Sequence, residues 1–514
     1  MSLLLVLRDP TAARQTADLT ALYTPRSPRF GHYLSAAAVA ARYGPSPDVV
    51  ARVRRVLQGY GLHGAWQQGN NWLSVSGTAA RFAAAFGVRT RWYRSPHGVR
   101  YYASARDPLL PARLRPDVTE SGHLSSYAEP QQYAVPTGGL APTDLLAAYD
   151  ATPLRTMGLD GSGQTIVFFE LDGFAQSDLD TFTGKYGLPP MHPQIKAGPT
   201  LPPGGETTMD LEVSHEIAPG AKLVIYNVDL STAKSNAQAL QIFLDLQTKM
   251  VTDNPGAVIS QSWGGCEKAD SQAYADALKN VYDHADALGE SIFVSTGDNA
   301  AYECLRVSPR GTVPSPDNLA VPLPAAVPGV TAVGGTRLSV AANGGWYNET
   351  VWEAPAEIGG TGGGVTAYYP MPSWQQGPGV RNAQYNPHNQ REIPDVSADA
   401  DPYSGAAIYG PAGSSSAWIT GGGTSQSAPI WAGLTALIDE YLQRQGLHPV
   451  GFMNPALYQI AARATPYQAF HDITVGTNLY YPATPGYDMA SGLGTPDTWN
   501  LARDLEAYQK GGGQ

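Results

Sequence analysis

Five short apolar segments alternate with helical segments in the part of the chain beyond residue 143. These segments are Thr165–Leu171, Lys222–Val228, Ala257–Ser262, Ser291–Ser295 and Val330–Val333. Strands that alternate with helices in this way are typical of a parallel sheet covered by helices on both faces. We therefore expect residues 143–514 to form one large α/β domain.

Polar and aromatic side chains stand where several of these strands end. Glu170 closes the first strand, Trp263 follows the third, and Asp298 follows the fourth. The carboxyl ends of parallel strands are where open α/β sheets place their binding and catalytic groups. These three residues are therefore candidates for one site.

Residues 1–122 are predicted to form a separate α+β unit with a ferredoxin-like fold. Its expected elements are strands Ser2–Leu7 and Asn71–Val75, helices Thr11–Leu22, Pro47–Leu57 and Ala79–Phe86, and a hairpin over Val88–Tyr102 that turns at Ser95–Gly98. A polar stretch punctuated by proline and glycine follows over residues 123–142 and indicates a linker.

Charge is divided unevenly between these parts. Residues 1–120 hold sixteen arginines, no lysine and six acidic residues, a formal charge of +10, whereas the remainder carries −21. The arginines are spread through an apparently folded unit, without a basic tail or a nucleic-acid-binding motif. We therefore expect no nucleic-acid partner, and an acidic partner within the same chain. No apolar run approaches the length of a membrane span, so no membrane contact is expected.

The segment Gly421–Pro429 places Ser425 between an apolar strand, Ala417–Thr420, and an amphipathic helix. The glycines allow a sharp turn and leave room for a substrate beside the hydroxyl. Backbone N–H groups and the positive end of the helix suit an oxyanion there. A nucleophile is one interpretation. A serine that caps the helix, or a small anion site, is the other.

A serine nucleophile needs a base, and none of the ten histidines has a convincing setting. His215 lies on a helix among acids, and His471 precedes an aspartate in a loop. Glu206 and Asp210 are better placed, because they are one helical turn apart and share a face. A solvated acidic face is the alternative, but the helix is otherwise apolar and looks largely buried.

Three motifs occur in an order that resembles the sedolisin family of serine-carboxyl peptidases, of the kumamolisin-like kind: Glu206 to Asp210, Ser295–Asp298 and Gly422–Ser425. Further similar stretches are Ser260–Gly265, Ala332–Thr336, Pro394–Ser397 and Phe470–Thr474. The resemblance covers essentially the whole chain, and residues 1–122 resemble the family's activation pro-domain. It implies a subtilisin-like fold in the large domain.

The resemblance implies a role for each candidate residue. Ser425 would be the nucleophile, Glu206 its general base, and Asp210 the group that orients Glu206. Asp298 would donate a hydrogen bond in the oxyanion hole, which only its protonated form can do. Glu170 and Trp263 would extend the acidic network behind Asp210.

The resemblance also implies one Ca²⁺ site in two loops near the carboxyl terminus. Its expected ligands are the carboxylates of Asp472 and Asp488 and the backbone carbonyls of Ile473, Thr484 and Gly486, completed by water. Such an oxygen-rich set suits calcium.

Two further features bear on the site. Cys266 and Cys304 follow candidate active-site strands, so they form either one bridge between neighbouring loops or two free thiols. The family's Gly-Asp-Ser-Gly reads Gly297-Asp298-Asn299-Ala300 here, in a region expected to shape the substrate cleft.

The sequence thus predicts a secreted, acid-active endopeptidase made as a zymogen, although no signal peptide is recognisable at its start. Its partners would be protein or peptide substrates, and its own pro-domain as an intramolecular inhibitor. A tripeptidyl-peptidase of the same family is the nearest alternative. A catalytically silent binding protein on the same scaffold is a more distant one.

Overall fold

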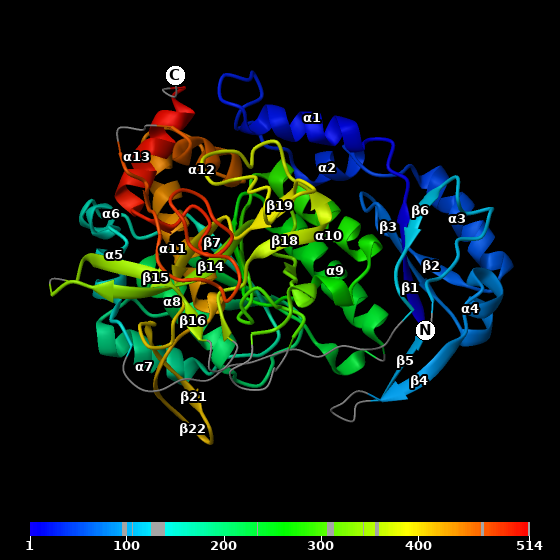
Figure 1. Ribbon diagram of the computed structural model, residues 1–514, viewed down its shortest axis with the longest axis horizontal. Coiled ribbons are helices and arrows are strands. Elements are labelled where there is room, and N and C mark those ends of the chain that lie inside the picture. The colour runs from blue at the N-terminus through cyan, green and yellow to red at the C-terminus, as the bar shows by residue number, and fades with distance from the viewer. Residues whose placement is uncertain are drawn as a thin grey trace.

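The computed structural model describes residues 1–94, 100–104, 106–124, 139–233, 235–305, 313–342, 344–354, 359–463 and 467–511. A small amino-terminal domain packs against one side of a much larger α/β domain (Figure 1). The predicted linker lies mostly outside the described residues, as does the turn Ser95–Gly98. No helix in the described parts of the chain is long and apolar enough to cross a membrane.

The amino-terminal domain contains a four-stranded antiparallel sheet in the order β2–β3–β1–β6. Its strands are β1 (Ser2–Leu7), β2 (His63–Ala65), β3 (Trp72–Ser76) and β6 (Val118–Ser121). Helices α3 (Pro47–Gly59) and α4 (Ala79–Phe86) connect them in the order β-α-β-β-α-β, which is the expected ferredoxin-like arrangement. Alternate strand residues such as Leu3 and Leu5 bury their side chains against Leu57 and Phe82.

The predicted hairpin is present as β4 (Thr90–Arg94) and β5 (Arg100–Ser104). Two further helices, α1 (Ala12–Tyr23) and α2 (Ala36–Arg42), lie over the large domain rather than over the small sheet (Figure 1). Sequence reasoning found α1 but missed α2, as well as strands β2 and β6.

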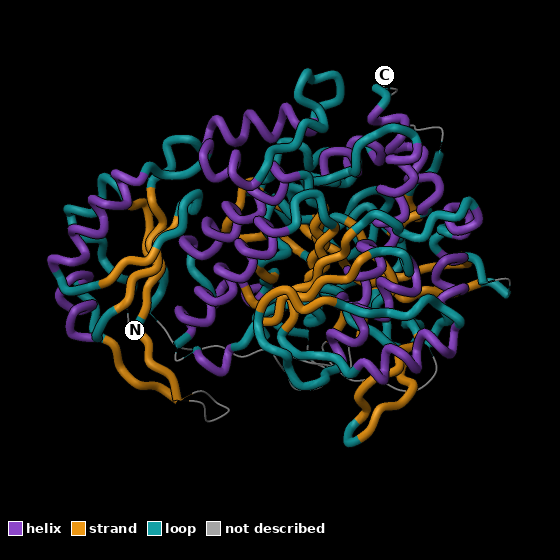
Figure 2. The backbone as a smooth tube through the Cα atoms, turned by 180° about the vertical axis from the view of Figure 1, so that it is seen from behind, coloured by secondary structure: helices purple, strands orange, loops and turns teal. Residues whose placement is uncertain are grey.

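An eight-stranded, mostly parallel sheet forms the centre of the large domain (Figure 2). The strand order is β15–β14–β12–β10–β7–β9–β8, and β20 pairs with β14. The strands are β7 (Thr165–Glu170), β8 (Gln194–Ala197), β9 (Lys222–Asn227), β10 (Val258–Gln261), β12 (Ser291–Ser295), β14 (Thr331–Val340), β15 (Trp346–Val351) and β20 (Val396–Asp399). All five predicted strands are among them, so the prediction of a parallel α/β sheet is confirmed.

Two layers of helices cover the sheet. Helices α8 (Gly205–Ile217) and α11 (Thr424–Arg444) cover one face, and α9 (Asn236–Asp253) and α10 (Gln272–Leu288) cover the other. Successive residues of β7 show why both faces are apolar: Ile166 and Phe168 enter the first core, whereas Val167 and Phe169 enter the second.

Shorter elements surround this core. The helices are α5 (Pro142–Ala148), α6 (Thr152–Thr156), α7 (Gln176–Tyr186), α12 (Asn454–Ala461) and α13 (Thr498–Gln509), and the paired strands are β11 (Gly265–Cys266) with β13 (Pro322–Leu323), β16 (Glu353–Ala354) with β17 (Gly359–Gly360), β18 (Gly364–Pro370) with β19 (Gln390–Ile393), β21 (Ala407–Ala412) with β22 (Ser415–Thr420), and β23 (Phe470–His471) with β24 (Thr495–Pro496). The strand expected before Ser425 is β22, which belongs to a separate hairpin rather than to the central sheet.

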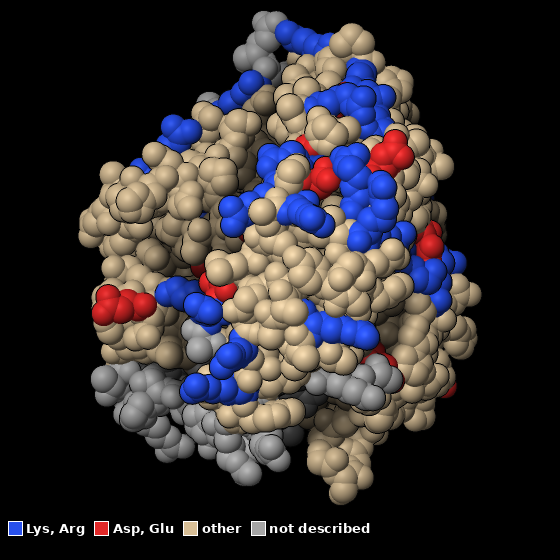
Figure 3. Space-filling view, turned by 90° about the vertical axis from the view of Figure 1, so that its right-hand side faces the viewer, with Lys and Arg blue, Asp and Glu red and all other residues tan. Residues whose placement is uncertain are grey.

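Arginines on the amino-terminal domain do not pair with acids of the large domain in the described residues. Arg29 and Arg42 both bind Asp18, and Arg52 binds Asp117, so these ion pairs are internal to the small domain. Arginine side chains instead gather over its outer face (Figure 3). The expectation that direct arginine–carboxylate pairs hold the two domains together is therefore wrong for this part of the interface.

Tyrosine hydroxyls and backbone carbonyls make several of the hydrogen bonds between the two domains. Tyr23 donates its hydroxyl to the carbonyl of Asp286 at 2.5 Å, and Tyr33 donates to the carbonyl of Val450 at 3.2 Å. Tyr508 of the large domain donates to the carbonyl of Tyr23 at 3.0 Å. Neutral hydrogen bonds of this kind are insensitive to the charge state of carboxylates.

Candidate active site

The turn before α11 exposes Ser425 while it buries its neighbours. Gly423 adopts φ +79°, a left-handed conformation that favours glycine, and the helix begins at the next residue. Thr424, Gln426 and Ser427 are buried, whereas Ser425 remains partly accessible. The N-cap position belongs to Gly423, so Ser425 is not the capping serine of this helix. The capping interpretation is therefore excluded.

Glu206 and Asp210 lie on α8, which packs against α11. Every α8 side chain from Thr207 to Ile217 is buried, so the solvated acidic face weighed above is absent from this helix. Burial raises the pKa of Glu206 well above its usual range, while a hydrogen bond with Ser425 lowers it. The structure thus brings the predicted nucleophile and base together. The Ser425 hydroxyl also lies 3.5 Å from the carbonyl oxygen of Ser262.

A chain of acids continues behind Glu206. Asp210 is fully buried, and burial followed by the charges of Glu170 and Glu206 raises its pKa well above the usual range. A hydrogen bond joins Asp210 to Glu170, so the two carboxyls share a proton. Burial, with the charge of Asp172, raises the pKa of Glu170 to about 8. Trp263 donates its indole N–H to Glu170 Oε2 at 3.0 Å, which brings both predicted supporting residues into the network.

Asp298 lies beside the start of α11. Its Oδ1 accepts the backbone N–H of Thr424 at 2.8 Å and the Thr424 hydroxyl at 3.0 Å. Its other oxygen, Oδ2, is so close to Gly423 that an added Cβ would come within 2.6 Å of it. Burial raises the pKa of Asp298, which favours the protonated form that the oxyanion role requires.

Several contributing residues were not singled out by sequence reasoning. Ser262 donates to Asp210 Oδ2 at 2.8 Å and lies 3.1 Å from the carbonyl oxygen of Ser425, so it connects the acids to the nucleophile's helix. Thr207, in the first turn of α8, donates its backbone N–H to Asp172 Oδ1 at 3.0 Å, and its hydroxyl lies 3.1 Å from Glu170 Oε2. Asp172 stands two residues beyond Glu170 at the same strand end, and that position was the available signal.

Neither histidine considered as a base belongs to this site. His215 is buried on α8, where its Nε2 contacts the carbonyl of Pro189 at 2.8 Å, and burial lowers its pKa. His471 stacks on Trp346 with ring centroids 4.2 Å apart, and burial lowers its pKa to about 4.

The predicted calcium ligands come from two neighbouring loops. Asp472 Oδ2 accepts the N–H of Gly486 at 2.9 Å, and Asp488 Oδ2 accepts the N–H of Thr484 at 2.8 Å. Both carboxylates are therefore directed at the same three-residue turn. The Ser491 hydroxyl lies 3.1 Å from Asp488 Oδ1 and 3.5 Å from the carbonyl oxygen of Ile473. No cluster of three or more His, Cys, Asp or Glu side chains suited to a metal occurs among the described residues.

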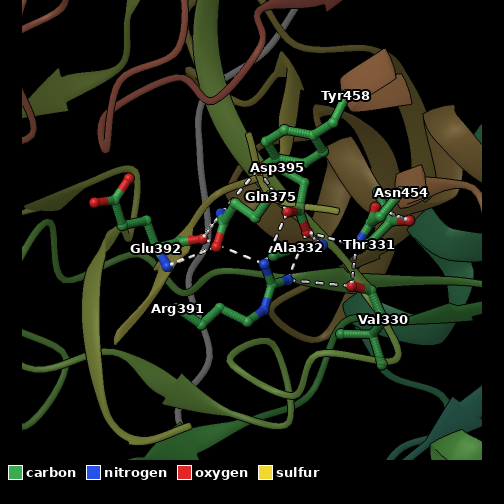
Figure 4. A network of polar contacts seen from close by, with 9 residues as sticks. All are labelled: Val330, Thr331, Ala332, Gln375, Arg391, Glu392, Asp395, Asn454 and Tyr458. Atoms are coloured by element: carbon green, nitrogen blue, oxygen red, sulfur yellow. Dashed lines mark hydrogen bonds and ion pairs between the residues drawn. The ribbon is translucent and has the colours of Figure 1, made fainter. Parts of the chain in front are cut away.

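A buried ion pair fixes the chain next to these loops (Figure 4). Arg391 and Asp395 are both fully buried, and Arg391 Nη2 lies 2.6 Å from Asp395 Oδ2. Asp395 also accepts from the N–H of Ala332 and the hydroxyl of Tyr458, each within 3 Å. The carboxylate thus joins β14 and α12, and the backbone carbonyl of Asp395 accepts the N–H of Leu493 at 2.8 Å, near the loops predicted to bind calcium.

The cleft region departs from the family pattern at a strained position. Ala300 stands where the family has glycine, and it adopts φ +54°. Cys266 and Cys304 form a disulfide, which resolves the alternatives left open by the sequence. Residues 306–312 of the long loop that follows Cys304 lie outside the described residues.

Both parts of the chain match known protein families. The family described as Pro-kumamolisin, activation domain, matches residues 1–120, and the Subtilase family matches residues 195–461. Kumamolisin from Bacillus sp. strain MN-32 is 33% identical, covering 90% of this chain and 84% of that protein. Tripeptidyl-peptidase 1 from Canis lupus familiaris is 27% identical, covering 98% of this chain and 91% of that protein.

A solved structure of Pseudomonas sedolisin, a serine-carboxyl proteinase complexed with two molecules of pseudo-iodotyrostatin, aligns with a TM-score of 0.60 and 30% identity. The alignment covers 74% of this chain and all of that one. Fold and matches together define a subtilisin-like α/β serine peptidase. More narrowly, the chain belongs to the sedolisin family of serine-carboxyl peptidases, is kumamolisin-like, and carries the family's activation pro-domain.

Proposed function

We propose that this peptidase is an acid-active endopeptidase in which Ser425 is the nucleophile and Glu206 the general base. The observation that carries the proposal is the placement of a partly exposed Ser425 beside the half-buried Glu206, with Asp298 held against the same turn. No histidine of suitable setting competes for the role among the described residues. Carboxylates remain available as bases in acid, where a histidine would be protonated.

The reaction follows from these placements. Ser425 Oγ attacks the peptide carbonyl carbon, and its proton passes to Glu206 as the carbonyl π bond breaks. The resulting oxyanion accepts hydrogen bonds from protonated Asp298 and from the backbone N–H of Ser425. Glu206 then returns the proton to the leaving amine as the C–N bond breaks. Water releases the acyl group by the same steps, with Glu206 again accepting and then donating a proton.

Asp210 sets the state of the base. Glu206, Asp210 and Glu170 cannot all ionise freely in one buried cluster, so they titrate as a coupled group. Loss of the first proton from this group gives a base, while Asp298 keeps its own proton. A plot of activity against pH should therefore be bell-shaped. Its acid limb reflects ionisation of the cluster formed by Glu206, Asp210 and Glu170, and its alkaline limb reflects ionisation of Asp298.

The direct test measures hydrolysis of a denatured protein substrate from pH 3 to pH 8. We expect a maximum in acid and complete loss of turnover in Ser425→Ala. A maximum at neutral or alkaline pH would refute the mechanism. A peptide with an acetylated amino terminus separates the two enzyme alternatives, because a tripeptidyl-peptidase requires a free amine. The silent-scaffold alternative is disfavoured because Ser425, Glu206 and Asp298 are all retained.

Activation is proposed to occur by self-cleavage within residues 123–142, between His123 and Ala141. Incubation of the full chain at about pH 4, followed by sequencing of the new amino terminus, tests this. Ser425→Ala should remain uncut. A secreted location is proposed as well, and the Cys266–Cys304 disulfide supports it, since such bonds persist in oxidising compartments.

One Ca²⁺ ion is proposed as a structural cofactor of the carboxyl-terminal loops. The donor set fits, because Asp472 and Asp488 face one turn whose carbonyls, with that of Ile473, supply hard oxygen ligands. Bound Ca²⁺ would stabilise the folded state by mass action. Chelation should therefore lower the unfolding temperature, and Asp488→Ala should abolish that difference. An unchanged melting curve in a verified metal-free sample would count against the site.

A further inference from the structure

The helix that carries Glu206 and Asp210 begins without a cap of its own. Its N-cap residue is Gly204, which has no side chain to accept the N–H groups of the first turn. Asp172, from the loop after β7, takes that place. Its Oδ1 accepts the N–H of Thr207 at 3.0 Å, and its Oδ2 lies 3.4 Å from the backbone nitrogen of Glu206.

Asp172 also joins the cap to the acidic chain. The Thr207 hydroxyl lies 2.6 Å from Asp172 Oδ1 and 3.1 Å from Glu170 Oε2. One hydroxyl thus links the carboxyl end of β7 to the first turn of α8. The start of the helix is fixed to the strand end that supplies the supporting acid.

The space around Asp172 is fitted to this contact. A Cβ added at Gly204 would come within 1.8 Å of Asp172 Oδ2. Only glycine at position 204 therefore allows the carboxylate to approach the helix so closely. Gly204 therefore provides no capping side chain but leaves the space in which Asp172 caps the helix.

The charges around Glu206 are all acidic. Burial raises the pKa of Glu206, the hydrogen bond from Ser425 lowers it, and the charges of Glu170, Asp172 and Asp298 raise it further. Asp210 lies one turn along the same helix. Asp172 is also the largest charge effect on Glu170. Removal of the charge at Asp172 should therefore lower the pKa of Glu206 and Glu170.

We propose that Asp172 is a positioning residue of this peptidase: it anchors the first turn of α8 so that Glu206 faces Ser425, and it holds a further carboxyl group beside Glu206 and Glu170. The proposal rests on the proposed function of Ser425 and Glu206.

Three variants separate position from charge. Asp172→Asn keeps an acceptor oxygen and removes the charge, so kcat should stay within about threefold while the acid limb of the pH profile moves about half a unit lower. Asp172→Ala removes both, and Gly204→Ala keeps the charge but displaces it. In both of these variants kcat should fall about 10- to 100-fold with little change in KM, because a displaced Glu206 is no longer aligned to accept the proton of Ser425.

Asp497→Asn is the matched control. Asp497 caps α13 by accepting the N–H of Asn500, and it lies outside the network of Glu206, Asp210 and Glu170. It should leave kcat and the acid limb unchanged even if it lowers Tm.

Two results would overturn the proposal: Asp172→Asn with an unmoved acid limb, or Asp172→Ala with wild-type kcat and only a lower Tm. If Asp172→Ala does not fold, Asp172→Asn decides alone. The Ser425→Ala variant distinguishes failure of this inference from failure of the proposed function. If Ser425→Ala were active, Ser425 would not be the nucleophile and the proposed function would be wrong. An inactive Ser425→Ala beside wild-type profiles in the Asp172 variants would defeat this inference only.

Discussion

Asp298 Oδ1 accepts the backbone N–H of Thr424 at 2.8 Å, so the proposed oxyanion acid is fixed to the residue directly before the nucleophile. Because Oδ1 also accepts the Thr424 hydroxyl, both known donors approach the same oxygen. The acidic proton therefore belongs on Oδ2, the oxygen on the Gly423 side. A site built in this way orients its own proton before any substrate arrives.

Substitution of Asp298 should separate loss of the donor from loss of the acid. Asp298→Ala removes the donor and should lower kcat by about 10²- to 10³-fold. Asp298→Asn keeps a carbonyl for Thr424 and an N–H donor that does not titrate, so it should be impaired less and should lose the alkaline limb. The altered donor geometry still predicts a clear loss. An Asn variant with the wild-type alkaline limb would assign that limb to another group.

Stability should fall as the pH rises from about 4 to about 8. Burial raises the pKa of Glu170 and Asp399 to about 8 and that of Asp270 and Asp439 to about 7. The folded state therefore holds protons that the unfolded chain releases near pH 4. The stability from these neutral carboxyl groups is fully present below about pH 4 and is lost as the pH passes through the folded pKa values.

Thermal unfolding of Ser425→Ala at several pH values measures this dependence without self-digestion. The unfolding temperature should be higher at pH 4.5 than at pH 8. Asp439→Asn should flatten the curve, because the amide keeps the acceptor for the N–H of Val450 but cannot ionise. A curve that rises toward pH 8 would contradict the assigned direction of the pKa shifts.

The Arg391–Asp395 pair should be costly to break and cheaper to replace whole. Arg391→Met leaves Asp395 charged and buried, which typically costs about 3–5 kcal/mol. The double variant Arg391→Met, Asp395→Leu leaves no uncompensated charge and should recover part of the loss. Chemical denaturation of all three proteins measures the difference. Equal stabilities of the single and double variants would show that the charge of Asp395 is not what the single substitution exposes.

Much of this site could be predicted from local sequence patterns. The strands ending at Glu170 and Ser295, the exposed Ser425 and the helical pair Glu206 and Asp210 each follow from periodicity and turn chemistry. Asp172 did not emerge, because its partner is a helix start some thirty residues away and only the fold brings the two together.

The contacts between the two domains were also not predictable from the sequence. The net charges suggested arginine–carboxylate pairing across the domains, but net charge gives no information on which atoms meet. Asp18 binds two arginines of its own domain, and Tyr23 reaches a backbone carbonyl of the other. Sequence reasoning also left the two cysteines undecided, since their pairing depends on two loops that meet only in three dimensions.

A buried histidine offers a different account of how acid loosens the pro-domain. His284 lies on α10 beneath the pro-domain, where Tyr43 stacks on it with ring centroids 6.4 Å apart. Burial lowers the pKa of His284 to about 4, although the charges of Asp283 and Asp9 oppose this. When the pro-domain departs, the pKa should return toward 6.5. Docking therefore weakens as the pH falls from about 6.5 to about 4, by at most about 3 kcal/mol.

The rate of self-processing of the full chain at pH 4 tests this account. His284→Gln cannot gain a charge, so it should process several-fold more slowly than the wild type, while His192→Gln on the surface should not. Since no ion pair joins the two domains among the described residues, the rate should also change little between 50 mM and 500 mM salt. A strong salt dependence, together with a wild-type rate in His284→Gln, would instead assign the release of the pro-domain to the opposite net charges of the two domains. The reverse result would place the acid trigger at the contact between Tyr43 and His284.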